Sequence, residues 1–468
     1  MNNYGNIKLD KTYLSLDELF YTLQNPQPVK EPSIFCYNKE LGEKLNIRLS
    51  ENEIVDFFSG NKIIPDSKPF AQAYAGHQFG YFTMLGDGRA IILGEIRFKD
   101  KLYDIQLKGS GRTPYSRGGD GRATLPSMLR EYLISEAMHN LNIPTTRSLC
   151  VIETKDKLYR QREEPGAVLT RIAESHIRVG TFEYASIVGI KQLGQLLTYA
   201  IERHYPELKS DNNPAKVFLE KVMDKQIQLI VDWLRVGFIH GVMNTDNTSI
   251  SGETIDYGPC AFMNSYDEKT AYSSIDTEGR YSFGNQAFIL KWNIAKLAEA
   301  LLPLIDEEQN ESIKVAEDII NGFDEKFQNA YIKMLSKKLG LLSKKKEDLG
   351  IIKELLRLIS KYKMDYTNTF FILSTNEDPF TEDDGKDWFI RWKKRIEKQD
   401  PLKTIKTMQE TNPALIPRNH YVEKAIRSKT EFGKLLCALK KPYDYKNINK
   451  EFQKPPVSEL GYKTYCGT

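Results

Sequence analysis

The sequence predicts an α+β protein with a strand-rich N-terminal lobe, a helix-rich lobe and a C-terminal helical extension. One observation is a dense run of glycines between residues 75 and 121, which separates short β-type runs at 81–85, 90–96 and 103–107. Such runs, broken by glycine turns, are typical of an antiparallel meander. The other observation is that the apolar residues recur at helical spacing after this region.

The predicted helices follow in order along the chain. Leu125, Leu129 and Leu133 recur every four residues, and Pro126 suits the first turn of a helix. Apolar stripes at the same period predict further helices near 191–203, over about 215–236 and through most of the chain from residue 293 onward.

One segment between these helices has a different character, with the sequence FIHGVMNTDNTSISGETIDYGPCAF. Its Ser251-Gly252 pair predicts a tight hairpin between 247–250 and 253–255. From these patterns we predict four parts: an N-terminal segment (1–68), a strand-rich N-lobe (69–165), a helical C-lobe (166–340) and a helical extension with a tail (341–468).

Length and composition exclude several classes of protein. The 468 residues include 66 Lys plus Arg and 63 Asp plus Glu, and the net charge of +3 gives no electrostatic reason to expect nucleic acid as a partner. No stretch approaches the ~20 apolar residues of a membrane span. The N-terminal residues lack a signal-peptide core, and the five cysteines contain no C-x-x-C pair. We therefore expect a cytoplasmic protein without a zinc site, and a monomer by default.

Three motifs that carry chemistry follow one another along the chain: a Gly86-Asp87-Gly88 turn, Lys108 at a strand end, and Asn247 ahead of Asp256-Tyr257-Gly258. Each motif alone is weak, but their order matches a kinase-like nucleotide site. Glycines let backbone amides approach phosphate, a lysine neutralises phosphate, and Asn and Asp supply oxygen ligands for Mg²⁺. The sequence therefore predicts a kinase-like nucleotide site. The lysine also needs a glutamate partner on the next helix, either Glu131 or Glu136.

The catalytic segment departs from protein kinases at one position. Kinases carry H-R-D-x-x-x-x-N, whose Asp takes the proton of the substrate hydroxyl. Here His240 and Asn247 keep the spacing in HGVMNTDN, but Val242 stands where the Asp should be and accepts no proton. Loss of such a base costs roughly 10²–10⁴ in rate. The remaining carboxylate, Asp246, either serves as the base for a differently placed substrate or caps the turn by a hydrogen bond.

The sequence also holds more arginine than a γ-phosphate donor needs. Arg112, Arg117 and Arg122 are interleaved with glycine, whereas Arg171 and Arg178 lie in an apolar stretch. Guanidinium groups in apolar surroundings typically bind carboxylate or phosphate with two hydrogen bonds. Together with the lysine, this charge suits a triphosphate whose outer phosphates are retained and then depart as pyrophosphate.

Five long runs between Pro69 and about Ile426 carry the most specific signal: PFAQAYAGHQFGYFTMLGDGRAIILGE, LKGSGRTPYSRGGDGRATLPSMLREYLISEAM, LTRIAESHIRVGTFEYAS, HGVMNTDNTSISGETIDYGPCAF and NPALIPRNHYVEKAI. These runs resemble the selenoprotein O (YdiU) family, and nearly the whole chain is consistent with it in length and order. The resemblance implies a protein-kinase-like fold that binds ATP in a flipped orientation. It also implies transfer of AMP to Ser, Thr or Tyr of proteins, with Mg²⁺ or Mn²⁺ as the metal, and UMP transfer is attributed to family members as well.

Residue roles follow from the same resemblance. It implies an ion pair between Lys108 and Glu131, proton acceptance by Asp246, and metal binding by Asn247 and Asp256. Beside Lys108, Glu131 and Asp256, the nucleotide-binding residues that it implies are Gly86, Gly88, Arg89, Asp120, Gly121, Arg171 and Arg178.

A C-terminal cysteine is a further feature of the resemblance. Many family members carry a cysteine or selenocysteine near the C-terminus, and Cys466 resembles the cysteine version. The proposed role is redox regulation through a disulfide, for which the loop after D-Y-G offers only Cys260. An inert terminal thiol and a buried Cys260 are at least as well supported by the sequence.

Three functional hypotheses follow. The leading one is nucleotidyl transfer, in which a protein hydroxyl attacks the α-phosphorus of ATP. A true protein kinase is disfavoured by Val242. A pseudokinase that binds ATP only as a scaffold is disfavoured because Lys108, Glu131, Asn247 and Asp256 all remain, and a scaffold needs no metal pair.

Overall fold

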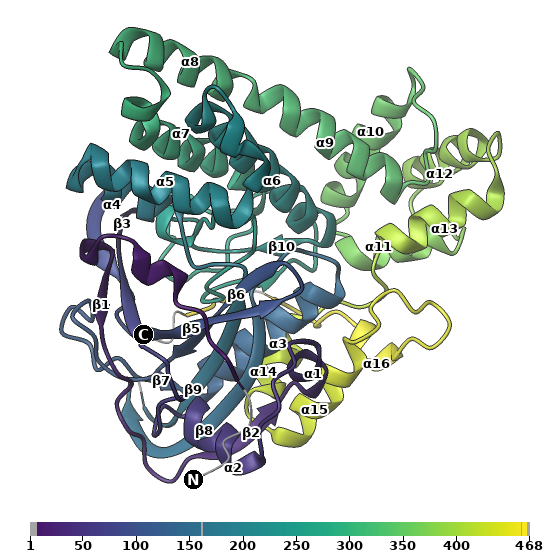
Figure 1. The fold of residues 1–468 in the computed structure, drawn as a ribbon. Helices are drawn as coiled ribbons and strands as arrows, with labels where there is room; N and C mark the ends of the chain where they lie inside the picture. The colour runs from purple at the N-terminus through teal and green to yellow at the C-terminus, as the bar shows by residue number, and fades with distance from the viewer. Residues whose placement is uncertain (1–6, 161, 460, 466–468) are drawn as a thin grey trace.

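The computed structural model describes residues 7–160, 162–459 and 461–465. Figure 1 shows a strand-rich lobe at the lower left, a helical lobe above it and a helical extension at the right. The predicted α+β class is confirmed, with a strand-rich lobe, a helical lobe and a helical extension. Within the described ranges, no helix is long and apolar enough to cross a membrane.

The strand-rich lobe is built on a nine-stranded antiparallel sheet. Its main path runs β1-β3-β5-β6-β9-β8-β2, and β4 pairs with β3 while β7 pairs with β9. The strands predicted at 81–85, 90–96 and 103–107 form as β4, β5 and β6. The strands of the sheet are β1 (Tyr21–Leu23), β2 (Ser33–Tyr37), β3 (Phe70–Gln78), β4 (Tyr81–Gly86), β5 (Ala90–Phe98), β6 (Lys101–Lys108), β7 (Ala123–Thr124), β8 (Arg147–Tyr159) and β9 (Glu163–Ala173).

Three long strands, β3, β8 and β9, were not predicted from the sequence. Most positions of β3 and the last eight positions of β9 are buried. A strand that is buried on both faces lacks the apolar–polar alternation that marks a strand in sequence. Strand β9 crosses the boundary that we predicted after residue 165, and β1 and β2 come from the predicted N-terminal segment (1–68). The domain limits stay a prediction.

Helices of the C-lobe form where the apolar periodicity predicted them. The helices predicted at 191–203 and 215–236 form as α5 and α6. Helix α6 begins after Asn213, whose side chain accepts a hydrogen bond from the Lys216 amide, and ends at Gly237 in the left-handed region. The helices up to the end of this lobe are α1 (Lys39–Lys44), α2 (Glu51–Phe58), α3 (Leu125–Asn140), α4 (Val179–Val188), α5 (Ile190–His204), α6 (Pro214–Val236), α7 (Gln286–Ile305), α8 (Gln309–Asn321) and α9 (Phe323–Lys338).

The C-terminal extension has two parts. Helices α10–α13 project to the right in Figure 1, whereas α14–α16 return toward α3 and the sheet. The return is seen in Phe432 of α15, whose ring packs against Phe35 of β2 with 5.5 Å between centroids. The helices of the extension are α10 (Asp348–Lys361), α11 (Tyr366–Ser374), α12 (Asp383–Ile396), α13 (Pro401–Thr411), α14 (Asn419–Ala425), α15 (Lys429–Ala438) and α16 (Lys450–Gln453).

The hairpin predicted around Ser251-Gly252 is wrong. A turn is present there, but Ser249 forms a bridge with Arg178 and Thr254 forms a bridge with Thr145. Each arm therefore pairs with a distant segment, which a local turn signal does not reveal. The short elements around this segment are β10 (Phe238–Ile239), β11 (Ala261–Phe262) and 3₁₀ turns at Thr12–Ser15, Glu18–Phe20, Pro206–Ser210, Thr245–Asn247 and Phe283–Asn285.

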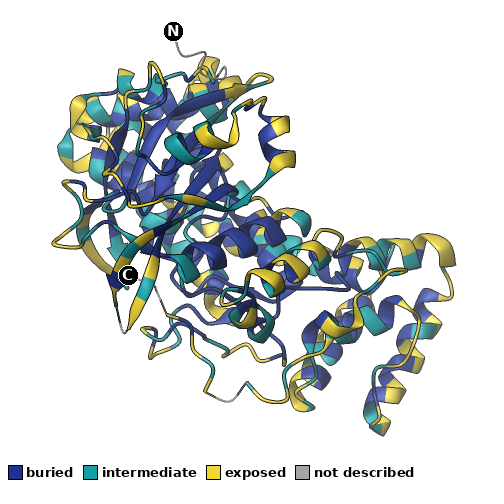
Figure 2. Ribbon diagram, turned by 90° about the horizontal axis from the view of Figure 1, so that it is seen from below, coloured by how far each residue is buried: buried dark blue, intermediate teal, exposed yellow. Residues whose placement is uncertain are grey.

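A continuous core holds the two lobes together. Leu133 of α3, Ile230 of α6 and Leu297 of α7 are buried in the same apolar cluster. Figure 2 shows buried residues filling the sheet and the central helices, with exposed residues on the outward turns. Helix α3 is thereby fixed between the lobes, and this fixes the glutamates that it carries.

Candidate active site

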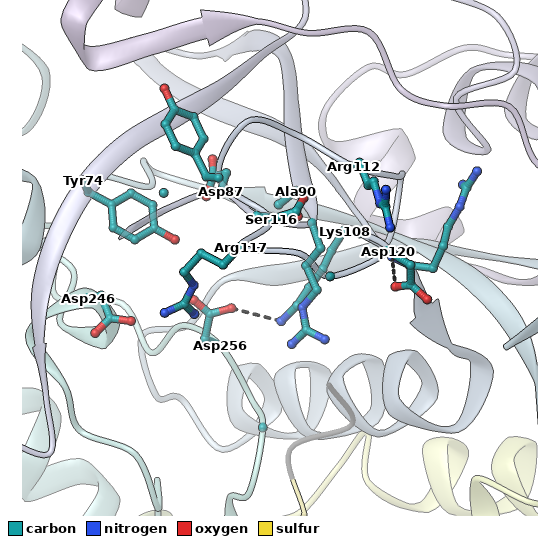
Figure 3. A pocket seen from close by; sticks show the side chains of 18 of the residues that line it. Tyr74, Asp87, Ala90, Lys108, Arg112, Ser116, Arg117, Asp120, Asp246 and Asp256 are labelled. Carbon is teal, nitrogen blue, oxygen red and sulfur yellow. Dashed lines mark hydrogen bonds and ion pairs between the residues drawn. The ribbon is translucent and has the colours of Figure 1, made fainter. Parts of the chain in front are cut away.

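A cleft of about 660 Å³ collects the predicted site residues. All of them line it except Glu131, which lies behind Lys108. Eight lysine and arginine side chains and four aspartates form its charged walls. Figure 3 shows Tyr74, Lys108, Asp246 and Asp256 directed into this space. An excess of cations in a concave site favours a polyanionic ligand.

The inner wall is a network around Lys108, at the end of β6. Its Nζ lies 2.8 Å from Glu131 Oε2 and 3.0 Å from Asp256 Oδ1. Arg171 of β9 contacts the same two carboxylates, with 2.5 Å between its Nη2 and Asp256 Oδ1. The structure therefore pairs Lys108 with Glu131, whereas Glu136 binds Arg147.

Burial and charge act together on these groups. Burial acts to raise the pKa of Asp256, but the fields of Arg171, Lys108 and Arg178 hold it well below its usual value. Burial and the neighbouring Arg171 lower the pKa of Lys108. Asp256 thus stays an anion in the cleft, and its charge is shared among several cations.

Arg178 lies at the same wall, just before α4. Its guanidinium lies 4.3 Å from the Tyr74 ring and 3.6 Å from Asp87, and it donates to the carbonyl of His176. Its Nε is buried without a hydrogen-bond partner among the described residues. Asp87 is buried, which raises its carboxyl pKa. A buried guanidinium with an unused donor is suited to an anionic ligand.

The Gly86-Asp87-Gly88 turn packs against the next loop of the chain. A Cβ on Gly86 would lie 2.3 Å from the Tyr115 ring, and a Cβ on Gly88 would lie 2.7 Å from the Tyr115 carbonyl. These two glycines are therefore required for the close packing of the turn against the loop that carries Tyr115, whether or not phosphate also approaches them. Arg89 follows the turn, and its carbonyl accepts a hydrogen bond from Gly109.

The outer wall is the glycine-rich loop of residues 110–122. Asp120 binds Arg160 at 2.8 Å and accepts a hydrogen bond from the Arg122 amide. A Cβ on Gly121, which has φ +68°, would lie 2.1 Å from the Gly111 carbonyl. Asp120 and Gly121 therefore shape this loop, and the contacts found for Asp120 are with the Arg160 side chain and the Arg122 backbone amide.

The loop that carries Asp256 is held from both sides. Asp256 has φ +60°, in the left-handed region that non-glycine residues rarely adopt. The next residue, Tyr257, is buried and its hydroxyl hydrogen-bonds the Thr145 hydroxyl. On the other side, His240 Nε2 lies 2.8 Å from the Ile255 carbonyl. These contacts hold the carboxylate of Asp256 toward the cleft.

Asp246 and Asn247 lie on the 3₁₀ turn Thr245–Asn247. Asp246 Oδ2 accepts a hydrogen bond from Gln78 at 3.3 Å, and its Oδ1 is buried without a hydrogen-bond partner among the described residues. Burial raises the pKa of Asp246 to about 6. Asn247 Nδ2 donates to the Val242 carbonyl at 2.9 Å. This hydrogen bond identifies the other branch of the side-chain amide as the oxygen, Oδ1. Because Asp246 lines the cleft while its Oδ1 is buried, Oδ2 is the carboxylate oxygen that can meet a proton donor in the cleft.

A divalent cation fits the donor set at one corner of the cleft. Asn247 and Asp256 both line it, and Asp256 engages protein cations chiefly through Oδ1, with Oδ2 3.8 Å from Arg178. Mg²⁺ is usually held by one or two protein oxygens plus phosphates and water. No group of three or more His, Cys, Asp or Glu side chains able to hold a metal occurs in the described part of the chain.

The sequence analysis did not identify several residues that the structure places in or next to the cleft. Asp87 stands inside the recognised G-D-G turn, and Tyr74 and Gln78 stand on β3, which was not predicted. Gln78 is separated from Asp246 by 168 residues, and no local pattern links the two. Cys260 is buried, while Cys466 lies outside the described residues, so the disulfide hypothesis stays untested.

Comparisons with known proteins agree on the relationship. A family model described as protein adenylyltransferase SelO matches residues 4–441. The chain belongs to the SelO family. It is 50% identical over 478 residues to the protein nucleotidyltransferase YdiU of Anoxybacillus flavithermus, covering 99% of this chain and 100% of the relative. It is 48% identical over 485 residues to the protein of that name from Bacillus thuringiensis subsp. konkukian, covering 100% and 99%.

Membership in the SelO family confirms the resemblance seen in the sequence and places the chain among nucleotidyltransferase enzymes. Among solved structures, ROP2 from Toxoplasma gondii matches with 8% identity and a TM-score of 0.27. The match covers 63% of this chain and 87% of ROP2, which is described as a virulence factor with a protein-kinase fold and no enzymatic activity.

Proposed function

We propose that this SelO-family enzyme transfers AMP from ATP to Ser, Thr or Tyr hydroxyls of proteins and releases pyrophosphate. The hydroxyl oxygen bonds to the α-phosphorus, the bond from that phosphorus to the β-phosphate bridging oxygen breaks, and the hydroxyl proton passes to Asp246. UTP is the alternative donor, in which case UMP is transferred by the same steps.

The supporting observation is that the cleft lacks the carboxylate that kinases use as the base but holds another one, Asp246, nearby. Val242 replaces the kinase Asp, and the nearest cleft carboxylate along the chain is Asp246, whose Oδ2 faces the cleft while its Oδ1 is buried. A pKa of about 6 keeps Asp246 largely ionised at neutral pH and still basic enough to take a proton.

The inner cations then bind the outer phosphates. Lys108, Arg171 and Arg178 are fixed on the inner wall, so they hold the leaving pyrophosphate without reorganising during the reaction. Asn247 and Asp256 would hold Mg²⁺ or Mn²⁺, which neutralises phosphate charge when bound. The α-phosphorus is thereby directed toward Asp246 and the acceptor hydroxyl.

Two labelled forms of ATP test this proposal. We expect label at the α-phosphate to appear on protein and label at the γ-phosphate to be released as pyrophosphate. Transfer of the γ-label instead would identify a protein kinase, and transfer of neither would identify an ATP-binding scaffold. Labelled UTP in the same assay measures whether UMP is transferred.

A further inference from the structure

The hairpin of β3 and β4 extends from the sheet onto the catalytic segment of the other lobe. Three successive residues of β3 and its turn make the contact. The His77 amide donates to Thr245 Oγ1 at 2.7 Å, and the Phe79 amide donates to Asn244 Oδ1 at 3.2 Å. Between them, Gln78 donates to Asp246, so the hairpin holds each residue of the segment 244–246.

The contact is closely packed around Asp246. A Cβ on Gly76 of β3 would lie 3.0 Å from Asp246 Oδ1, and a Cβ on Gly180 of α4 would lie 2.0 Å from the Ala75 carbonyl. Glycine is required at position 180 for this approach of α4 to β3, and a side chain at position 76 would crowd the Thr245–Asn247 turn. His77 also pairs with Glu183 of α4, which ties the strand to that helix.

We infer that Gln78 is a positioning residue for the transfer reaction, which orients the Asp246 carboxylate across the boundary between the lobes. The inference rests on the proposed function. An ionised carboxylate needs a donor, so the Gln78 amide presents Nε2 to Oδ2 at 3.3 Å. Since Oδ1 is buried against β3, Oδ2 is the oxygen that faces the cleft, and Gln78 holds it in place to accept the proton of the acceptor hydroxyl.

This arrangement gives the hairpin a defined part in the reaction. Gln78 acts through Asp246, so its loss should affect the chemical step and leave nucleotide binding intact. Misplacement of a catalytic group by about 1 Å can cost about 100-fold in rate. We therefore expect Gln78→Ala to lower kcat between about 10- and 100-fold, with the KM for ATP changed less than about twofold.

The experiment uses the full chain, α-labelled ATP and a soluble protein extract as the acceptor mixture. Steady-state rates give kcat and KM for ATP, and calorimetry with α,β-methylene ATP gives nucleotide affinity. Gln78→Glu keeps the shape of the side chain but places a carboxylate beside Asp246, so its kcat should fall at least as far as that of Gln78→Ala. Gln192→Ala is the matched control, since Gln192 donates to Asp17 at 3.1 Å in a similar amide–carboxylate contact outside the cleft.

A double-mutant cycle with Asp246→Asn decides whether Gln78 acts through Asp246. We expect Gln78→Ala to change the residual rate of Asp246→Asn less than about twofold, because the group that it positions is already disabled. Equal losses in both backgrounds, an unchanged kcat, or a loss of nucleotide affinity alone would overturn the inference. If the wild-type chain transfers no α-label, the proposed function itself fails, and the two failures are thereby distinguished.

Discussion

The two walls of the cleft hold their cations in different ways. On the inner wall, the side chains of Lys108, Arg171 and Arg178 are only 7%, 2% and 2% exposed, and each contacts a carboxylate. On the outer wall, Arg112 and Arg117 are exposed on a loop rich in glycine. The inner cations are held by strands and by the chain around α4, whereas the outer ones are held by turns.

This difference separates two tasks. Charges that are buried and already paired cost little reorganisation when a ligand binds, so the inner wall is suited to orient phosphates for reaction. Exposed charges attract an oppositely charged ligand from a distance, and salt weakens this attraction. The outer wall is therefore suited to attract the nucleotide. Substitutions on the inner wall should therefore reduce catalysis and stability, and those on the outer wall should reduce affinity in a salt-dependent way.

The largest effect is expected for Asp256→Ala. The change removes a proposed metal ligand and the carboxylate shared by Lys108 and Arg171. We expect transfer to fall by at least about 1,000-fold and the dependence of nucleotide binding on Mg²⁺ to disappear. Label transfer from α-labelled ATP and calorimetry with and without Mg²⁺ measure the two effects.

Asp256→Asn provides the control for folding in this experiment, because it keeps the shape of the side chain. Its thermal unfolding should stay closer to the wild type than that of Asp256→Ala, while its transfer rate stays low. Metal-dependent affinity equal to the wild type in either variant would contradict the metal assignment.

Stability should respond most to Glu131→Ala. Glu131 is buried and contacts both Lys108 and Arg171, so its removal leaves two buried cations short of a counter-charge. Breaking a buried pair from one side typically costs about 3–5 kcal/mol. Urea unfolding at neutral pH measures the loss, and a change below about 1 kcal/mol would show that the inner wall is not a rigid, paired network.

Sequence reasoning recovered the parts of this site that local patterns encode. Lys108 ends a strand with clear β-type composition, and Asp256 belongs to a short motif with a fixed order. The choice between Glu131 and Glu136 was open from the residues alone, because both lie on α3 and only the resemblance favoured Glu131. The packing of α3 in the core turns Glu131 toward Lys108 and Glu136 toward Arg147.

Contacts between distant segments could not be predicted in the same way. The hairpin expected at Ser251-Gly252 failed because its arms pair with Thr145 and Arg178, far along the chain. Strand β3 was missed because most of its positions are buried, which removes the alternation. The contact of Gln78 with Asp246 depended on that missed strand, so no sequence pattern pointed to it.

On the outer wall, the double variant Arg112→Ala/Arg117→Ala should weaken ATP binding by about tenfold at low salt. Both side chains are exposed at the cleft, so screening should shrink this difference at about 1 M salt, where the Debye length is about 3 Å. Calorimetry with α,β-methylene ATP at the two salt concentrations measures it.

Arg97→Ala is the matched control for that double variant. Arg97 is also exposed and pairs with Asp10, but it does not line the cleft. We expect its ATP affinity to equal that of the wild type. A loss of affinity that persists in high salt would assign Arg112 and Arg117 to direct, inner-wall contacts with phosphate and would remove the distinction between the walls.

The smallest effect is expected for Asp120→Asn on the outer wall. Burial acts to raise the pKa of Asp120, but the hydrogen bond from Arg160 leads the interactions that lower it below its ordinary value near 3.8. A lowered carboxyl pKa stabilises the fold at neutral pH, and this contribution is lost as the pH falls through the folded-state value. Since the side chain is 41% exposed, we expect a loss below about 1 kcal/mol at pH 7. Urea unfolding of both proteins should show that this difference disappears in acid, and a loss as large as that of Glu131→Ala would make the two walls energetically alike.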